Sequence, residues 1–147
     1  MKILVINGPN LNMLHLRAAE HYGDKSYEQL VKLLKTWGRK KEVEVEIFQS
    51  NHEGEIIDRI HRLDYDALVI NPGAFTHYSY AIRDALELVD KPKIEVHLSN
   101  IHSREDFRKV SITAQTCEGV ISGFKEYSYI LALEYIVEKY GSGERMP

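Results

Sequence analysis

Glu95, His97 and Ser99 alternate along a short apolar segment, and their side-chain types can support proton transfer. Residues two positions apart in a strand share a face, so we expect these three side chains to lie together. A carboxylate beside an imidazole fixes the ring tautomer and raises its basicity, which suits a general acid. The alternative is polar alternation without function on an exposed strand. The apolar opposite face and the following Asn100 favour the functional interpretation.

Arg17 and Tyr22 form a second candidate pair, in a polar segment that precedes Ser26. A free tyrosine titrates near pH 10, so its use as a base requires a nearby cation that stabilises the phenolate. Arg17 can supply that charge. On spacing alone, a surface tyrosine that only covers the sheet is the simpler interpretation of Tyr22.

Metal and thiol chemistry find little support. Cys117 is the only cysteine, which excludes an internal disulfide and a thiolate-rich metal site, and a buried packing role is expected for it. The seven histidines lack metal-ligand spacing: on a shared helix His52 and His61 would face opposite sides. We therefore expect no metal site.

Nucleotide and hydrolase chemistry are also disfavoured. The loop after the first apolar run has one glycine followed by Pro9, which fits neither a Walker-type loop nor a dinucleotide fingerprint. A flavin mononucleotide site needs less glycine and stays open as a minor alternative. A hydrolase built on Ser99 and His97 would lack both a nucleophile elbow and a separate base.

The elements that must position these residues alternate between strand and helix. Predicted strands cover Lys2–Ile6, Val43–Ile47, Ala67–Ile70, Lys93–Leu98 and Gly119–Gly123. Predicted helices begin at the Ser26 capping box, at Asn51 or His52, near Tyr80 and near Tyr129. This alternation, with right-handed crossovers, predicts an α/β fold: a flavodoxin-like three-layer sandwich with a five-stranded parallel sheet of order 2-1-3-4-5.

Polar clusters follow the predicted strands, and the carboxyl ends of parallel strands are where such sheets bind ligands. The clusters are Asn7-Gly8-Pro9-Asn10, Gln49-Ser50-Asn51-His52, Asn71-Pro72-Gly73-Ala74 and His97-Leu98-Ser99-Asn100. One domain over residues 1–140 is expected to carry this site, with a flexible tail at 141–147.

Composition excludes several partner classes. The chain has 147 residues, 19 basic and 22 acidic, and a net charge of -3 without a basic run, so nucleic acid is a poor candidate partner. The longest early apolar run, Ile3–Ile6, is too short for a signal peptide, and no segment suits a membrane span. We expect a soluble, unexported, cytoplasmic protein.

Five blocks of this sequence together resemble type II 3-dehydroquinate dehydratase. They are Ile6–Asn12, Gln49–Glu55, Ile70–Ala74, His77–Ser79 and Glu95–Ile101, and the resemblance extends from the first strand to the helix around Leu131–Leu133. It implies the reversible anti-elimination of water from 3-dehydroquinate, which gives 3-dehydroshikimate. Quinate breakdown uses the same reaction, and the shikimate pathway of aromatic amino acid biosynthesis is the expected role. The reaction passes through an enolate and needs no metal or organic cofactor.

The resemblance also implies catalytic roles, which agree with the needs of this chemistry. Tyr22 matches the proton acceptor, His97 the proton donor and Asn10 the group that stabilises the enolate. Arg17 matches the arginine that lowers the pKa of the tyrosine, and Glu95 matches the residue that orients the histidine.

Substrate binding and assembly are implied in the same way. The substrate would be held by Asn71, His77, the Leu98-Ser99 backbone and side chain, and Arg108. Asp84 matches a residue that reaches the site of a neighbouring subunit. Members of the family assemble as trimers packed into a homododecamer.

One segment departs from the family pattern, and it carries the base. We call residues 14–23 the lid segment. The usual glycine is replaced by His15 and the usual proline by Ala19, while Arg17, Tyr22 and Gly23 keep their spacing. A glycine gives access to positive φ and a proline fixes φ, so a lid with altered order or closing behaviour is expected.

Two further points concern other differences from the family and the alternative to an enzyme. Val110 and Ala114 also differ from common family residues, and we expect no mechanistic consequence. The main alternative to an enzyme is a noncatalytic flavodoxin-like module that binds a small anion and has lost turnover through its altered lid segment.

Overall fold

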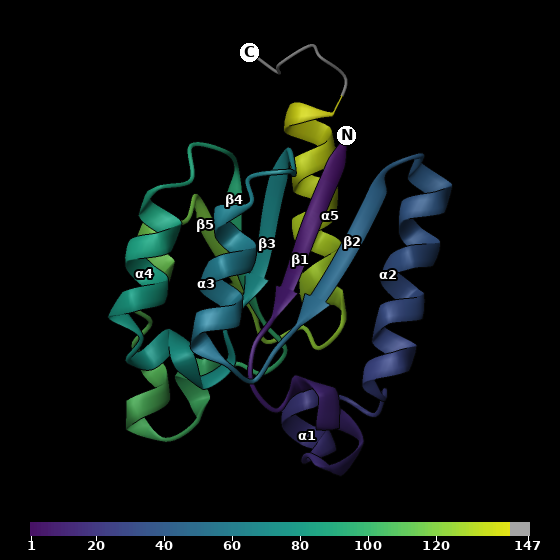
Figure 1. Ribbon diagram of the computed structural model, residues 1–147. Helices are drawn as coiled ribbons and strands as arrows, with labels where there is room; N and C mark the ends of the chain where they lie inside the picture. Colours follow the sequence, from purple (N-terminus) through teal and green to yellow (C-terminus); the bar gives the residue numbers. More distant parts are fainter. Residues whose placement is uncertain (142–147) are drawn as a thin grey trace.

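The computed structural model describes residues 1–141, so residues 142–147 of the expected tail lie outside the described part of the chain. Its centre is a parallel sheet of order β2-β1-β3-β4-β5, which confirms the predicted topology (Figure 1). The strands are β1 (Lys2–Asn7), β2 (Glu44–Gln49), β3 (Ala67–Asn71), β4 (Lys93–His97) and β5 (Gly119–Ser122).

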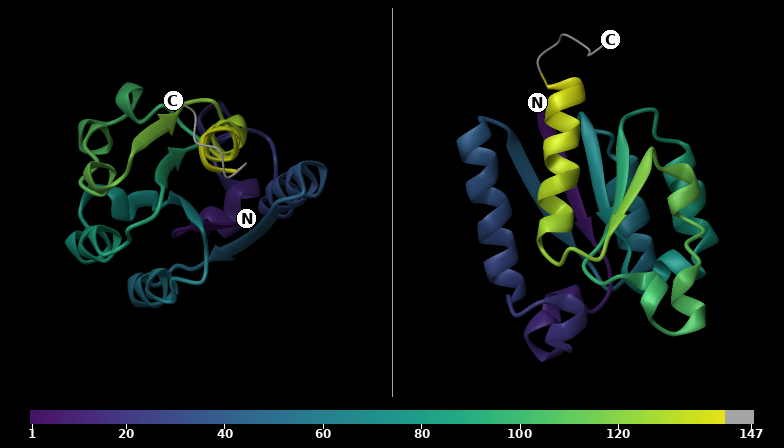
Figure 2. Two further views of the ribbon diagram at one scale, coloured as in Figure 1. Left: turned by 90° about the horizontal axis from the view of Figure 1, so that it is seen from above. Right: turned by 180° about the vertical axis from the view of Figure 1, so that it is seen from behind.

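Helices cover both faces of the sheet, so the fold has three layers (Figure 2). Helices α2 (Tyr27–Lys41) and α5 (Tyr127–Tyr140) pack on one face, and α3 (Glu53–His61) and α4 (Tyr80–Glu87) pack on the other. Successive strand residues point to opposite faces. Ile3 and Val5 therefore join the α2–α5 core, whereas Leu4 and Ile6 join the α3–α4 core.

Burial of the strands follows their place in the sheet. Every residue of β3, and every residue of β1 after Lys2, is buried, as a central parallel strand requires. Strand β2 lies at the edge and keeps only Val45 buried, which agrees with its alternating sequence.

The carboxyl ends of the strands lead into short helical segments at one end of the molecule (Figure 1). The polar segment that precedes Ser26 contains a 3-10 helix, η1 (Leu11–Leu16), and the short helix α1 (Ala19–Tyr22). The other segments at this end are the 3-10 helices η2 (Gly73–His77), η3 (Ile101–Ser103), η4 (Asp106–Lys109) and η5 (Ala114–Thr116).

The lid segment is helical where its altered sequence favours helix. Ala19 and Glu20 begin α1, and Gly23 ends it with φ 86°. His15 is not among the residues with positive φ. The missing glycine therefore costs no backbone strain at His15, contrary to the concern raised by the sequence.

A glycine is required where two loops of the site meet. A Cβ on Gly8 would lie 2.3 Å from the carbonyl oxygen of Pro72, and the Gly8 amide donates to the Asn71 carbonyl oxygen at 2.8 Å. The loops after β1 and β3 therefore touch through their backbones. Within residues 1–141, no helix has the length and apolar character needed to cross a membrane.

Candidate active site

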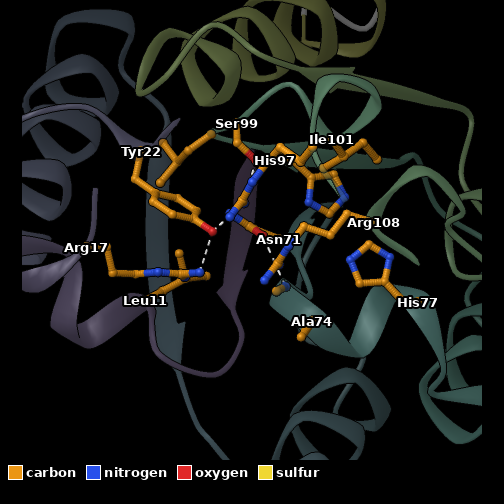
Figure 3. Close-up of a pocket in the computed structure, with 13 residues that line it drawn as sticks. Leu11, Arg17, Tyr22, Asn71, Ala74, His77, His97, Ser99, Ile101 and Arg108 are labelled. Atoms are coloured by element: carbon orange, nitrogen blue, oxygen red, sulfur yellow. Dashed lines mark hydrogen bonds between the residues drawn. The ribbon is translucent and has the colours of Figure 1, made fainter. Parts of the chain in front are cut away.

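A pocket opens where the loops after β1, β3 and β4 converge (Figure 3). The residues that line it are Leu11, Arg17, Tyr22, Asn71, Gly73, Ala74, His77, His97, Leu98, Ser99, Ile101, Arg104 and Arg108. Eight of the predicted site residues are among them: Arg17, Tyr22, Asn71, His77, His97, Leu98, Ser99 and Arg108. The structure thus brings together groups from distant parts of the sequence.

Tyr22 lies between two guanidinium groups. Both Arg17 Nη2 and Arg104 Nη1 donate to its phenol oxygen. The Arg17 Cζ atom lies 3.7 Å from the ring centroid of Tyr22, and the Arg104 Cζ atom lies 4.9 Å from it. Two cationic donors therefore converge on one phenol oxygen.

His97 is backed by a fully buried carboxylate. Its Nε2 atom lies 2.8 Å from Glu95 Oε2, and the Glu95 side chain has no exposed surface. This contact confirms that the two side chains share one face of β4. Because Nε2 is engaged by the carboxylate, Nδ1 is the ring atom of His97 that remains for a ligand.

The Glu95 carboxylate also accepts three hydroxyl groups. Thr76 Oγ1 and Ser111 Oγ donate to Oε2 at 2.9 and 2.7 Å, and Thr113 Oγ1 donates to Oε1. Burial by itself raises the pKa of Glu95, but the hydrogen bonds from His97, Thr113 and Ser111 outweigh it and hold that pKa below its usual value. Glu95 is therefore ionised at neutral pH.

Asn71 is fixed by a buried tyrosine of α5. Its Nδ2 atom donates to Tyr129 Oη at 2.9 Å, and its Oδ1 atom accepts from the Gly73 amide at 3.1 Å. Tyr129 Oη in turn donates to Asn7 Oδ1 at 2.6 Å. These bonds set the orientation of the Asn71 amide, and one N–H of Nδ2 stays available to a ligand.

His77 and Arg108 line the side of the pocket opposite Arg17 and Tyr22 (Figure 3). His77 Nδ1 donates to the Val110 carbonyl oxygen at 2.7 Å, which leaves Nε2 as an acceptor. Burial lowers the pKa of His77, so its ring is neutral at neutral pH. Arg108 donates from Nε to Glu105 at 2.6 Å, and its two terminal nitrogens can still donate to a substrate carboxylate.

The pocket is strongly positive. Three arginines line it, Arg17, Arg104 and Arg108, together with two histidines, whereas none of the residues that line it is acidic. Burial and then the neighbouring positive charges lower the pKa of Arg17, although the charge of Tyr22 counteracts them. Such a pocket suits a small anion and the negative charge that develops during enolate formation.

Comparison with known proteins places this arrangement in a family. Residues 1–137 match the family model for dehydroquinase class II. The 3-dehydroquinate dehydratase of Thermotoga petrophila is 68% identical over 139 residues, which are 95% of this chain and 96% of that protein. The chain belongs to the class II dehydroquinase family. The recognition made from the sequence blocks is thereby confirmed.

Other dehydroquinases agree in sequence and in structure. The 3-dehydroquinate dehydratase of Caldicellulosiruptor bescii is 56% identical over 140 residues, with 93% of this chain and 97% of that protein covered. The crystal structure of type II dehydroquinase from Butyrivibrio crossotus superposes with a TM-score of 0.91 at 52% identity, covering 92% of this chain and 97% of that one.

Three residues suggested by the dehydroquinase resemblance lie outside the pocket lining. Glu95 stands behind His97, as its predicted orienting role requires. Asn10 is exposed beside Leu11 and adopts the left-handed conformation, with φ 69°. Asp84 lies on α4 and forms no side-chain hydrogen bond or ion pair within residues 1–141.

Sequence reasoning missed several groups that complete this dehydroquinase site. Arg104 contacts Tyr22 from 82 positions away, and its Nε atom is buried without a partner in the described part of the chain. Its place in the segment that also holds Arg108 was the available signal. Ser111 and Thr113 lie in the segment to which no mechanistic consequence had been assigned.

Proposed function

We propose that this chain catalyses the reversible anti-dehydration of 3-dehydroquinate to 3-dehydroshikimate through an enolate, as a hydro-lyase of the shikimate pathway. The observation that carries the proposal is a phenol held by two guanidinium groups in the same pocket as a carboxylate-backed imidazole. Family membership supports the same reaction.

Base and acid are assigned to Tyr22 and His97. Tyr22, as the phenolate favoured by Arg17 and Arg104, removes a proton next to the ketone of the substrate. His97 donates a proton to the departing hydroxyl from Nδ1, while Glu95 holds its ring from Nε2. The proton taken by Tyr22 and the one given by His97 balance, so the net products are 3-dehydroshikimate and water.

Substrate contacts are assigned to the rest of the pocket. Arg108 takes the substrate carboxylate, and Asn71, His77 and Ser99 take its hydroxyls, with the Leu98-Ser99 backbone. Asn10 is assigned to the enolate oxygen. Asn10 is exposed and is not among the residues that line the pocket, so this assignment includes a local rearrangement.

The proposal also covers the oligomeric state and the cellular location. We infer a cytoplasmic homododecamer built from trimers, in which Asp84 reaches the site of a neighbouring subunit. Asp84 has no partner among the side chains of residues 1–141, which leaves its carboxylate available for such a contact. The molar mass in sedimentation equilibrium tests the assembly, and a monomer or a free trimer would contradict it.

The absorbance of the conjugated enone tests the reaction. Purified protein is mixed with 3-dehydroquinate and a chelator, and the ultraviolet absorbance created by dehydration is followed. A rise that survives chelation supports a metal-free lyase. Ligand binding without any rise, in a folded protein, would contradict the proposal and favour the noncatalytic module.

Tyr22→Phe separates binding from chemistry. The variant keeps the ring and loses the ionisable oxygen, so kcat falls by about 10²- to 10⁴-fold while substrate still binds. Tyr127→Phe is the matched control, because Tyr127 is 62% exposed and lies outside the pocket lining. Retained activity in Tyr22→Phe would remove Tyr22 from the role of base.

A further inference from the structure

Three hydroxyl groups surround Glu95, and none of them belongs to a residue that lines the pocket. Thr76 comes from η2, while Ser111 and Thr113 come from the segment between η4 and η5. The side chains of Thr76 and Thr113 are fully buried, and all three hydroxyl oxygens contact one another as well as the carboxylate. The cluster therefore excludes water from Glu95 and replaces it with fixed donors.

The backbone holds this cluster in place. The Ile112 amide donates to the Thr76 carbonyl oxygen at 2.8 Å, which ties the segment to η2. The Ala114 amide donates to Ser111 Oγ at 3.0 Å, so that hydroxyl must send its own proton elsewhere. The acceptors within reach are the Glu95 carboxylate at 2.7 Å and Thr76 Oγ1 at 2.6 Å, and of these the carboxylate carries the negative charge.

Neutral donors differ from a cation in their effect on His97. An arginine or lysine beside Glu95 would neutralise the carboxylate and weaken its attraction for an imidazolium. Within residues 1–141, His97 is the sole basic side chain in ion-pair contact with Glu95. The hydroxyl groups thus stabilise the carboxylate without cancelling its charge, and the whole charge stays available to His97.

The other titratable groups that face Glu95 do not compete with His97 for the charge of the carboxylate. Burial lowers the pKa of His77 on η2, so that ring is neutral at neutral pH. Burial and then the charge of Glu95 raise the pKa of the Cys117 thiol to about 12, so the thiol is neutral too. Neither His77 nor Cys117 therefore places a charge beside Glu95.

We propose that Thr76, Ser111 and Thr113 are positioning residues for the proton donor: their hydroxyls keep Glu95 ionised and fixed behind His97 without a competing cation. The inference rests on the proposed function, because it explains how the assigned acid is supported. It assigns a mechanistic role to the segment that contains Val110 and Ala114, for which the sequence had suggested none.

The titration of Glu95 tests this role in the protein without substrate. Glutamate carboxyl carbons are labelled with ¹³C, and the signal lost in Glu95→Gln identifies Glu95. Thr113→Val keeps the shape of the side chain and removes one donor to the ionised form. The Glu95 midpoint therefore rises by about one pH unit, the scale of one hydrogen bond to a charged group.

Two matched variants separate positioning from simple destabilisation. Thr113→Ser keeps the hydroxyl and is expected to restore the wild-type midpoint. Thr116→Val removes the hydroxyl of Thr116, which lies on η5 and donates to the Thr113 carbonyl oxygen at 2.7 Å. This variant is expected to leave the Glu95 midpoint unchanged. If Thr113→Val does not fold, Ser111→Ala removes a half-buried donor with less disturbance of the core.

Kinetics give the second readout. Because the hydroxyls act through His97 and not on bound substrate, Thr113→Val is expected to lower kcat about tenfold with KM nearly unchanged. A wild-type midpoint in both Thr113→Val and Ser111→Ala, or an equal shift in Thr116→Val, would overturn the inference. Absence of turnover in the wild type would instead overturn the proposed function and leave the titration result intact.

Discussion

Tyr22 shares its phenol oxygen between two arginines, so the base does not depend on Arg17 alone. The two guanidinium groups come from segments 82 and 5 positions away in the chain. The shorter spacing made Arg17 recognisable from the sequence, and the longer one hid Arg104. Glu95 and His97 were also recognisable from the sequence, because the two-residue period of a strand places them on one face.

Arg104→Gln is expected to reduce kcat about as much as Arg17→Gln does. Each variant removes one of the two cations that donate to the Tyr22 oxygen. Each is expected to cost roughly 10- to 100-fold, on the scale of one charge-assisted hydrogen bond. Steady-state kinetics at neutral pH provide the measurement. Arg39→Gln is the control, since Arg39 is exposed on α2 and its side chain donates to Thr36 Oγ1 at 3.1 Å. An unchanged kcat in Arg104→Gln would show that Arg17 suffices.

Elements with local signals were predictable from the sequence, and elements held by distant contacts were not. Ser26 and Gln29 form the expected capping box at the start of α2, with both reciprocal bonds present. Helix α5 begins at Tyr127, two residues before the predicted start. The link from Tyr129 to Asn71 spans 58 positions and leaves no periodic trace in the sequence.

Tyr129→Phe tests how helix α5 supports the pocket. The ring remains packed, but the Asn71 amide loses the partner that sets its orientation, and Asn7 loses a donor at 2.6 Å. We expect a rise in KM of about tenfold, together with a loss of roughly 1–3 kcal/mol of stability from the buried groups left unpaired. Urea unfolding and kinetics measure both. Unchanged KM with reduced stability would limit Tyr129 to the core.

The lid segment supplies Arg17 and Tyr22 to the pocket lining, and we expect it to move when a substrate enters. The cavity in the pocket measures about 30 Å³, room for roughly one water molecule. Helix α1 has no buried residue, and Lys125 Nζ binds its Glu20 carbonyl oxygen at 2.6 Å. Few buried contacts mean a low free energy of local opening.

Hydrogen exchange is expected to report this motion. In the Tyr22→Phe variant, backbone amides of residues 18–23 should exchange rapidly without ligand and at least about tenfold more slowly with 3-dehydroquinate bound. Amides in the middle of α2 serve as the internal reference. Equal and complete protection of residues 18–23 in both states would contradict a mobile lid segment.

At the scale of the whole molecule, the sheet order and the position of the pocket followed from the alternation of elements, whereas assembly did not. Asp84 carries the proposed link between subunits. Mixing Asp84→Ala with Tyr22→Phe subunits during refolding is expected to restore activity, because some sites then combine an intact Tyr22 with a neighbour's intact Asp84. Activity equal to the sum of the two separate variants would place Asp84 outside the site.

The start of β1 and the end of α5 both lie at the end of the sheet opposite α1 and the pocket (Figure 1). A tether joined before Met1 would therefore leave the loop end of the subunit facing outward. Immobilisation on a sensor chip through that end should preserve ligand access, whereas coupling through surface lysines such as Lys25 or Lys109 would crowd the entrance. The fold thus offers an attachment point separated from the chemistry by the length of the sheet.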